Sequence, residues 1–119
     1  MWNVLVVDDE IDICVLVTKH LERRGAKADY ALSIKEGLYK TTTTPYDLYV
    51  IDLNLKDGTG YDLVEKLRGL DVPSKIIMIS AHDAEASNAI EKGADYFLPK
   101  PLSKKAIDEA LQQVNFSSN

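Results

Sequence analysis

Five side chains capable of chemistry follow four apolar runs in different parts of the chain. They are three carboxylates, one hydroxyl and one ammonium group: Asp8, Asp9, Asp52, Ser80 and Lys100. Two like unit charges ~4 Å apart repel each other by about 4 kcal/mol at an effective dielectric constant of ~20. If the fold brings the three acids together, a cation must offset this repulsion, and an all-oxygen site with room for water suits Mg²⁺.

Strand-like and helix-like patterns alternate along the whole chain. Short runs typical of strands occur at 3–7, 26–31, 47–52, 75–80 and 95–98. Helix-like patterns lie between these runs and after the last one, which makes five consecutive strand–helix units. This alternation predicts an α/β fold in which a mostly parallel sheet has helices on both faces.

The carboxyl ends of parallel strands lie along one rim of a sheet, and ligands bind there, at the point where the strand order reverses. The five side chains are therefore expected at the same rim. In the strand order 2-1-3-4-5 the first and third strands are neighbours, so Asp8, Asp9 and Asp52 converge. Each residue alone has an ordinary explanation, such as an acid that follows a strand, but their combination is more specific.

Local signals predict the ends and the faces of two helices. Ser33, with Glu36 three residues later, resembles a capping box, and the helix that it opens must end before Pro45. His20, on the first helix (10–24), is placed on the solvent side. The predicted inward stripe of that helix consists of Ile11, Cys14, Val15, Thr18 and Leu21.

The composition predicts a single globular domain over residues 1–119. Of the 119 residues, 45% are hydrophobic and 28% are charged, so the chain can bury a real core. A net charge of −5 without a basic stripe counts against direct binding of nucleic acid. The single Cys14 excludes an internal disulfide, and neither a secretory signal nor a membrane-spanning stretch is present. We expect a cytoplasmic protein without a membrane partner.

Four motifs, VLVVDDE, VIDLNLKDGTG, IMIS and LPKP, resemble the receiver domains of bacterial two-component response regulators. The resemblance covers nearly the whole chain. It implies a flavodoxin-like, doubly wound sheet of five parallel strands in the order 2-1-3-4-5, with five helices. It also implies a signalling switch rather than an enzyme, one that catalyses its own phosphorylation and dephosphorylation. The expected partner is a sensor histidine kinase or a phosphotransfer protein.

The resemblance assigns the reacting groups residue by residue. Asp52 matches the phosphoacceptor, which takes a phosphoryl group from the phosphohistidine of a kinase. Ser80 matches the hydroxyl that hydrogen-bonds the incoming phosphoryl oxygen. Lys100 matches the lysine that pairs first with the acids and then with the phosphate, and Lys100-Pro101 resembles the cis peptide bond of the family.

The resemblance also implies a Mg²⁺ site. Asp9 matches the acid that binds the ion directly, and Asp8 matches the acid that holds a metal-bound water. The backbone carbonyl of Asn54 matches a further ligand beside Asp52. Glu10 extends the acidic run, and the resemblance leaves it without a role.

Signal transmission is expected on the face formed by the fourth helix, the fifth strand and the fifth helix. This face could bind a second copy of the chain or an output partner. Phe97 is either the aromatic residue whose ring turns inward after phosphorylation or a simple core ring. His82 is either a loop histidine without a role or, with Asn54, a residue that affects access of water. The chain ends at NFSSN, so we expect a stand-alone receiver or a piece of a longer regulator.

Two other classes of protein remain as alternatives. A phosphatase of the haloacid dehalogenase type also forms an aspartyl phosphate beside Mg²⁺. It needs a second acid two residues after the nucleophile, where this chain has Asn54, and room for a cap domain. A flavodoxin-like FMN carrier needs a phosphate loop rich in Ser, Thr and Gly, where this chain has DDE. The intact set of acids, hydroxyl and lysine argues against a degenerate receiver that acts only as a scaffold.

Overall fold

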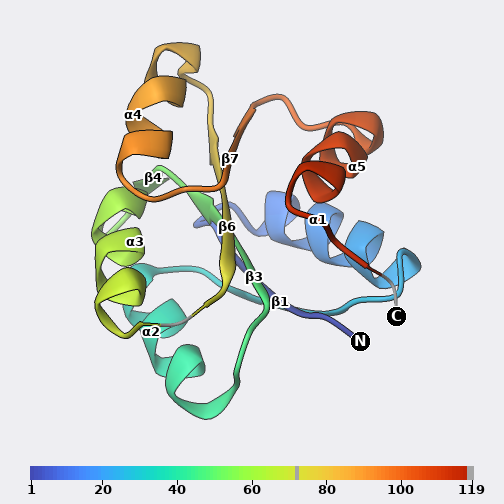
Figure 1. The fold of residues 1–119 in the computed structure, drawn as a ribbon, viewed down its shortest axis with the longest axis horizontal. Helices are drawn as coiled ribbons and strands as arrows, with labels where there is room; N and C mark the ends of the chain where they lie inside the picture. Colours follow the sequence, from blue (N-terminus) through green and yellow to red (C-terminus); the bar gives the residue numbers. More distant parts are fainter. Residues whose placement is uncertain (72, 118–119) are drawn as a thin grey trace.

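The fold is built on a five-stranded parallel sheet, seen in a computed structural model that describes residues 1–71 and 73–117 (Figure 1). Residues 72, 118 and 119, which the predicted domain 1–119 includes, lie outside this description. The sheet has the order β2-β1-β3-β6-β7, which confirms the predicted order 2-1-3-4-5. Its strands are β1 (Asn3–Val7), β2 (Lys27–Ala31), β3 (Leu48–Asp52), β6 (Lys75–Ser80) and β7 (Tyr96–Pro99).

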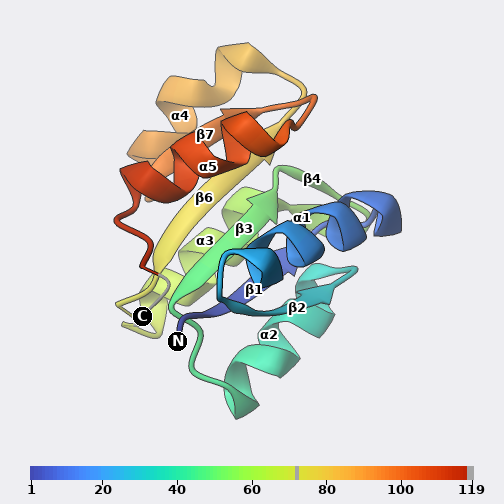
Figure 2. The ribbon, with the colours of Figure 1, turned by 90° about the vertical axis from the view of Figure 1, so that its right-hand side faces the viewer.

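Among the described residues, five α-helices cover the two faces of the sheet (Figures 1 and 2). They are α1 (Ile11–Arg23), α2 (Ile34–Thr43), α3 (Gly60–Gly69), α4 (Ala86–Glu91) and α5 (Lys104–Gln113). Helices α1 and α5 lie on one face, and α2, α3 and α4 lie on the other. Within the described residues, no helix is long and apolar enough to cross a membrane.

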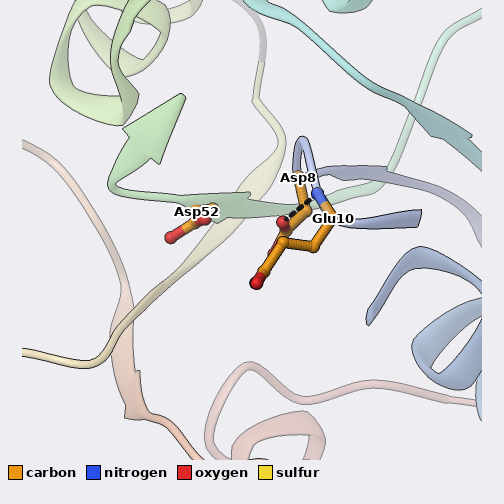
Figure 3. A group of neighbouring side chains, drawn as sticks. All are labelled: Asp8, Glu10 and Asp52. Carbon is orange, nitrogen blue, oxygen red and sulfur yellow. Dashed lines mark hydrogen bonds between the residues drawn. The ribbon is translucent and has the colours of Figure 1, made fainter. Parts of the chain in front are cut away.

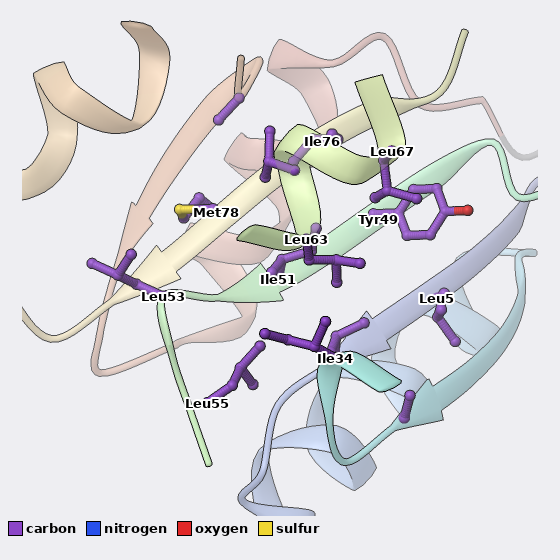
Figure 4. Close-up of a cluster of buried hydrophobic side chains, with 14 of the residues drawn as sticks. Leu5, Ile34, Tyr49, Ile51, Leu53, Leu55, Leu63, Leu67, Ile76 and Met78 are labelled. Atoms are coloured by element: carbon purple, nitrogen blue, oxygen red, sulfur yellow. The ribbon is translucent and has the colours of Figure 1, made fainter. Parts of the chain in front are cut away.

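Each face of the sheet has its own hydrophobic core, because successive side chains of a strand point to opposite sides. In β3, Tyr49 and Ile51 pack toward α2, α3 and α4, while Leu48 and Val50 pack toward α1 and α5. Figure 4 shows the first of these cores, in which Tyr49 and Ile51 lie beside Leu67 and Leu63 of α3. A central strand that is buried on both faces must be apolar at nearly every position, which explains the runs seen in the sequence.

The cap of α2 confirms part of the predicted capping box. The Ser33 hydroxyl accepts a hydrogen bond from the Glu36 amide at 3.1 Å, and α2 ends at Thr43, before Pro45. The Glu36 carboxylate, however, accepts from the amide of Leu32 at 2.6 Å rather than from Ser33, so the reciprocal half of the box is displaced by one residue. A complete capping box occurs instead at the start of α3.

The inward face of α1 differs from the predicted stripe at two positions. Ile11 and Val15 are 50% and 36% exposed, whereas Val17 is buried. The buried positions Cys14, Val17, Thr18 and Leu21 follow the i, i+3, i+4, i+7 spacing of one helical face. Val15 lies outside that face, and Ile11 begins the helix at the rim of the sheet.

The prediction that His20 faces solvent is wrong. His20 is 7% exposed, and its Nε2 lies 2.7 Å from Oδ1 of Asp108 on α5. Helices α1 and α5 cover the same face of the sheet side by side, so this flank of α1 meets a helix rather than water (Figure 2). The partner is 88 residues away along the chain, so the sequence near His20 carries no sign of it.

The segment after β3 forms a small antiparallel hairpin of β4 (Asn54–Leu55) and β5 (Gly58–Thr59). Its turn is tied to a distant helix. The Asp57 carboxylate accepts hydrogen bonds from the amides of Ile34 and Lys35, at 2.9 and 3.1 Å, in the first turn of α2. These bonds lower the pKa of Asp57.

We expect Asp57→Ala to destabilise the protein by about 1 kcal/mol at neutral pH, because two amides at a helix start lose their acceptor. The folded pKa of Asp57 is depressed, so its stabilisation is present above the unfolded pKa and is lost as pH falls through the folded value. Urea denaturation at neutral and acidic pH measures both effects. The neighbouring Lys56→Ala serves as the control, and an equal loss in the two variants would contradict the capping role.

Candidate functional site

Two buried carboxylates meet at the carboxyl ends of β1 and β3 (Figure 3). Asp8 follows β1 and is 0% exposed, and Asp52 ends β3 and is 4% exposed. The strands are hydrogen-bonded neighbours in which Val7 is opposite Ile51, so Asp8 and Asp52, the residues that follow, converge as predicted. Asp9, which was predicted to join them, is exposed, and Glu10 takes its place in the group. One carboxylate oxygen from each of Asp8, Glu10 and Asp52 lies within 4.8 Å of the others.

The positively charged ammonium group of Lys100 contacts all three of these carboxylates. Its Nζ lies 3.0 Å from Oε2 of Glu10, 3.4 Å from Oδ2 of Asp52 and 3.5 Å from Oδ2 of Asp8. Lys100 follows β7, and a backbone hydrogen bond to the neighbouring strand β6 holds it in place. Its amide donates to the carbonyl of Ser80 at 2.8 Å. The Lys100-Pro101 peptide bond is cis, in agreement with the resemblance.

Burial and mutual repulsion perturb the titration of these groups. Burial raises the pKa of Asp8 to about 6; the amide of Glu10 opposes this shift and the charge of Asp52 adds to it. Burial also raises the pKa of Asp52, against the attraction of Lys100. Burial acts to lower the pKa of Lys100, but its bond to Glu10 and the charges of Asp52 and Asp8 prevail and raise that pKa to about 12. Lys100 is therefore charged at any neutral pH.

Asp9 and Asn54 border the site without joining the converging oxygens of Asp8, Glu10 and Asp52. Both are exposed. They line an open cavity of about 600 Å³ together with Glu10, Asp52, Ala81 and Lys100. The Asn54 amide lies 3.4 Å from Oδ1 of Asp52, so the start of the hairpin rests against the carboxylate.

Ser80 and Phe97 lie on β6 and β7, beside this rim. Ser80 ends β6, is fully buried, and its hydroxyl accepts a hydrogen bond from the amide of His82 at 3.0 Å. Phe97 is half-buried on β7, opposite Met78, and packs against the core that α2, α3 and α4 cover. His82 is exposed in the loop that follows β6.

Reasoning from the sequence missed two contributors to the site. Of the three carboxylates, Glu10 makes the shortest contact to Lys100 Nζ, and the only local sign of this was a third acid in DDE. Gly60 opens α3 directly behind Asp52, and its amide donates to the carbonyl of Leu53 at 2.7 Å. A Cβ at position 60 would lie 2.5 Å from the carbonyl oxygen of Asp52, so only glycine permits this approach.

We expect Gly60→Ala to destabilise the protein by about 1–3 kcal/mol, because the new methyl group must push α3 away from the end of β3. Gly69→Ala in the same helix is the matched control, since nothing lies within 4 Å of a Cβ there. It should be neutral or stabilising by up to about 1 kcal/mol. Urea denaturation of both variants measures the difference, and similar midpoints would contradict the close approach.

Comparison with known proteins places the chain in a family. Residues 4–112 match the model of the response regulator receiver domain. The chain is 35% identical over 113 residues to the acid tolerance regulatory protein ActR of Rhizobium meliloti, a match that covers 93% of this chain and 58% of ActR. It is 33% identical to the alkaline phosphatase synthesis regulatory protein PhoP of Bacillus subtilis, covering 94% of this chain and 48% of PhoP. The chain thus spans about half the length of these relatives.

Solved structures agree in fold. The chemotaxis response regulator CheY4 of Vibrio cholerae superposes with a TM-score of 0.90 at 27% identity, covering 96% of this chain and 98% of CheY4. The response regulator TrrA of Thermotoga maritima, solved in complex with Mg²⁺ and BeF, gives 0.86 at 27% identity, covering 96% and 99%. These matches identify a signalling switch rather than a phosphatase or a flavin carrier. The chain belongs to the receiver domains of two-component response regulators.

Proposed function

We propose that Asp52 of this receiver domain accepts a phosphoryl group from the phosphohistidine of a sensor histidine kinase or a phosphotransfer protein. The observation that carries the proposal is the contact of one ammonium group, Lys100 Nζ, with Asp52 at 3.4 Å inside an open acidic cavity. A nucleophile and a cation able to neutralise an incoming phosphoryl group thus lie side by side. Phosphoryl transfer depends mainly on such positioning and charge neutralisation.

In the proposed transfer, a carboxylate oxygen of Asp52 forms the new O–P bond as the N–P bond of the phosphohistidine breaks. The bonding electrons stay on the imidazole nitrogen of the donor, which leaves as a neutral histidine after taking up a proton. Lys100 moves its ammonium group from the acids to the phosphoryl oxygens, and the Ser80 hydroxyl donates a hydrogen bond to one of them. Ionised Asp52 is favoured by the adjacent Lys100 charge.

The chemistry of the donor set fits Mg²⁺. Oδ2 of Asp8 is buried and has no hydrogen-bond partner among the described residues, although Lys100 Nζ lies 3.5 Å away. An orphaned carboxylate oxygen with a raised pKa gains from a hard divalent cation. We assign Asp8, Asp9, Asp52 and the backbone carbonyl of Asn54 to hold it. The bound ion would supply positive charge that offsets the negative charge gathered during transfer.

The proposed switch links this site to the face formed by α4, β7 and α5. Movement of Ser80 toward the phosphate and rotation of Phe97 would change this face, which binds a second copy or an output partner. Helix α4 supports the assignment, because Ala89 is its only buried residue among those described, so little packing resists its displacement. We further propose a cytoplasmic single domain over 1–119 that does not itself bind nucleic acid.

Incubation with acetyl phosphate and Mg²⁺ tests the proposal. We expect the intact mass to rise by one phosphoryl group per chain, with loss of the group at alkaline pH, as an acyl phosphate requires. A parallel sample with EDTA should stay unmodified. Absence of a Mg²⁺-dependent mass increase in folded protein would overturn the proposed function.

A further inference from the structure

Lys100 is bound more closely by Glu10 than by either buried acid. Its Nζ lies 3.0 Å from Oε2 of Glu10, against 3.4 Å for Asp52 and 3.5 Å for Asp8. The Lys100 side chain is 17% exposed and that of Glu10 is 61% exposed. The ammonium group therefore lies between two buried acids and one acid at the solvent boundary.

The backbone of Glu10 is fixed while its carboxylate remains free for this contact. Its amide donates to Oδ1 of Asp8 at 2.8 Å, which Figure 3 shows as a dashed line, and its carbonyl accepts the first hydrogen bonds of α1. Glu10 occupies the N-cap position of α1, yet its side chain makes no capping bond. The side chain instead reaches across the mouth of the site to Lys100.

We propose that Glu10 is a positioning residue that holds Lys100 in the resting site and competes with the incoming phosphoryl group for its ammonium. This inference rests on the proposed phosphoacceptor function. An incoming donor must draw Lys100 away from Glu10 before the ammonium can neutralise the transferring group. Glu10 also adds a negative charge at the entrance, where it repels every anionic donor.

Exposure explains why Glu10, rather than Asp8 or Asp52, is the partner that Lys100 can leave. When the contact breaks, the exposed Glu10 carboxylate regains water at small cost. The carboxylates of Asp8 and Asp52 are almost fully buried, and each would be left as an uncompensated buried charge. The exchange therefore starts at Glu10.

Phosphorylation kinetics test this competition. In Glu10→Gln we expect the half-saturating concentration of acetyl phosphate to fall roughly three- to tenfold, with the maximal rate changed by less than about twofold. Asp12→Asn is the matched control, because it removes one exposed negative charge in the first turn of α1. Its half-saturating concentration should match that of the natural chain. An equal shift in the two variants would overturn the proposal, because net charge alone would then explain it.

Glu10→Asp separates contact from charge. The shorter side chain keeps the negative charge but loses its reach to Lys100, so we expect a shift in the same direction as Glu10→Gln and of smaller size. A half-saturating concentration unchanged from the natural chain would overturn the contact as the cause. All these variants replace exposed side chains, so the fold is expected to persist, which circular dichroism checks.

A second measurement does not depend on phosphorylation. Acetylation of lysines by acetic anhydride, followed peptide by peptide by mass spectrometry, should be several-fold faster at Lys100 in Glu10→Gln than in the natural chain. Lys104, exposed on α5, should react equally in both. Equal rates at Lys100 would overturn the contact. A natural chain that accepts no phosphoryl group would instead overturn the proposed function, while the labelling still decides whether Glu10 holds Lys100.

Discussion

Asp52→Asn is expected to abolish stoichiometric phosphorylation by acetyl phosphate in the presence of Mg²⁺. The amide that replaces the carboxylate is a far weaker nucleophile and cannot form an acyl phosphate, so the loss should exceed a hundredfold in initial rate, roughly the effect of removing a reacting group. The change is nearly isosteric at a position that is 4% exposed, so the fold should persist. Intact-mass measurement over time gives the extent of modification.

The control for this prediction is Asp12→Asn, the same chemical change at an exposed acid outside the site. It should accept one phosphoryl group per chain, as the natural protein does. Stoichiometric labelling of the Asp52→Asn variant, mapped to any other residue, would refute the assignment of the phosphoacceptor.

The convergence of Asp8 and Asp52 could be predicted because it depends on short-range information. A strand that is buried on both faces is recognisable in the sequence as an apolar run. The residue that ends such a run lies at the rim of the sheet, independently of the helices that cover the faces. Only the strand order was then needed, and the motif resemblance supplied it. The observed pairing of Val7 with Ile51 follows from that order.

The parts that could not be predicted depend on contacts between distant segments. His20 is buried by Asp108, and Lys100 is bound by Glu10 from a position 90 residues away. Apart from the third acid in DDE, neither contact leaves a local pattern, because the residues around a polar side chain do not show whether a distant partner buries it. The requirement for glycine at position 60 has the same origin. A Cβ there would collide with the Asp52 carbonyl at the end of β3, and the residues next to Gly60 do not show this.

The resting site is held in an electrostatically unfavourable state. Three acids surround one ammonium group, and one buried oxygen of Asp8 lacks a hydrogen-bond partner among the described residues. The pKa of Asp8 is raised to about 6 because burial, together with the charge of Asp52, disfavours its ionised form. This raised pKa reflects the electrostatic cost. The same arrangement that costs stability favours the binding of a cation, so stability and metal affinity should change in opposite directions.

Asp8→Asn is therefore expected to stabilise the metal-free protein while weakening its response to Mg²⁺. The folded pKa of Asp8 rises from its ordinary value of 3.8 to about 6, which corresponds to a loss of up to about 3 kcal/mol at neutral pH. The unfolded chain binds fewer protons than the native one between these values, so the stability of the natural protein falls as pH rises from about 4 to about 6. The advantage of the variant should grow over this interval and vanish below it.

Urea denaturation in EDTA and in Mg²⁺, across this pH range, measures both halves of the prediction. In EDTA at neutral pH, Asp8→Asn should unfold at a higher urea concentration than the natural chain. Asp12→Asn should be slightly destabilised, because it removes an acid from the start of α1. Addition of Mg²⁺ should raise the midpoint of the natural chain more than that of Asp8→Asn, since the variant lacks one of the acids proposed to hold the ion and so gains less stability from binding it. If Asp8→Asn is instead less stable in EDTA, the Asp8 carboxylate is stabilised by Lys100 more than burial and Asp52 disfavour it, and the metal is not needed to offset repulsion at this rim.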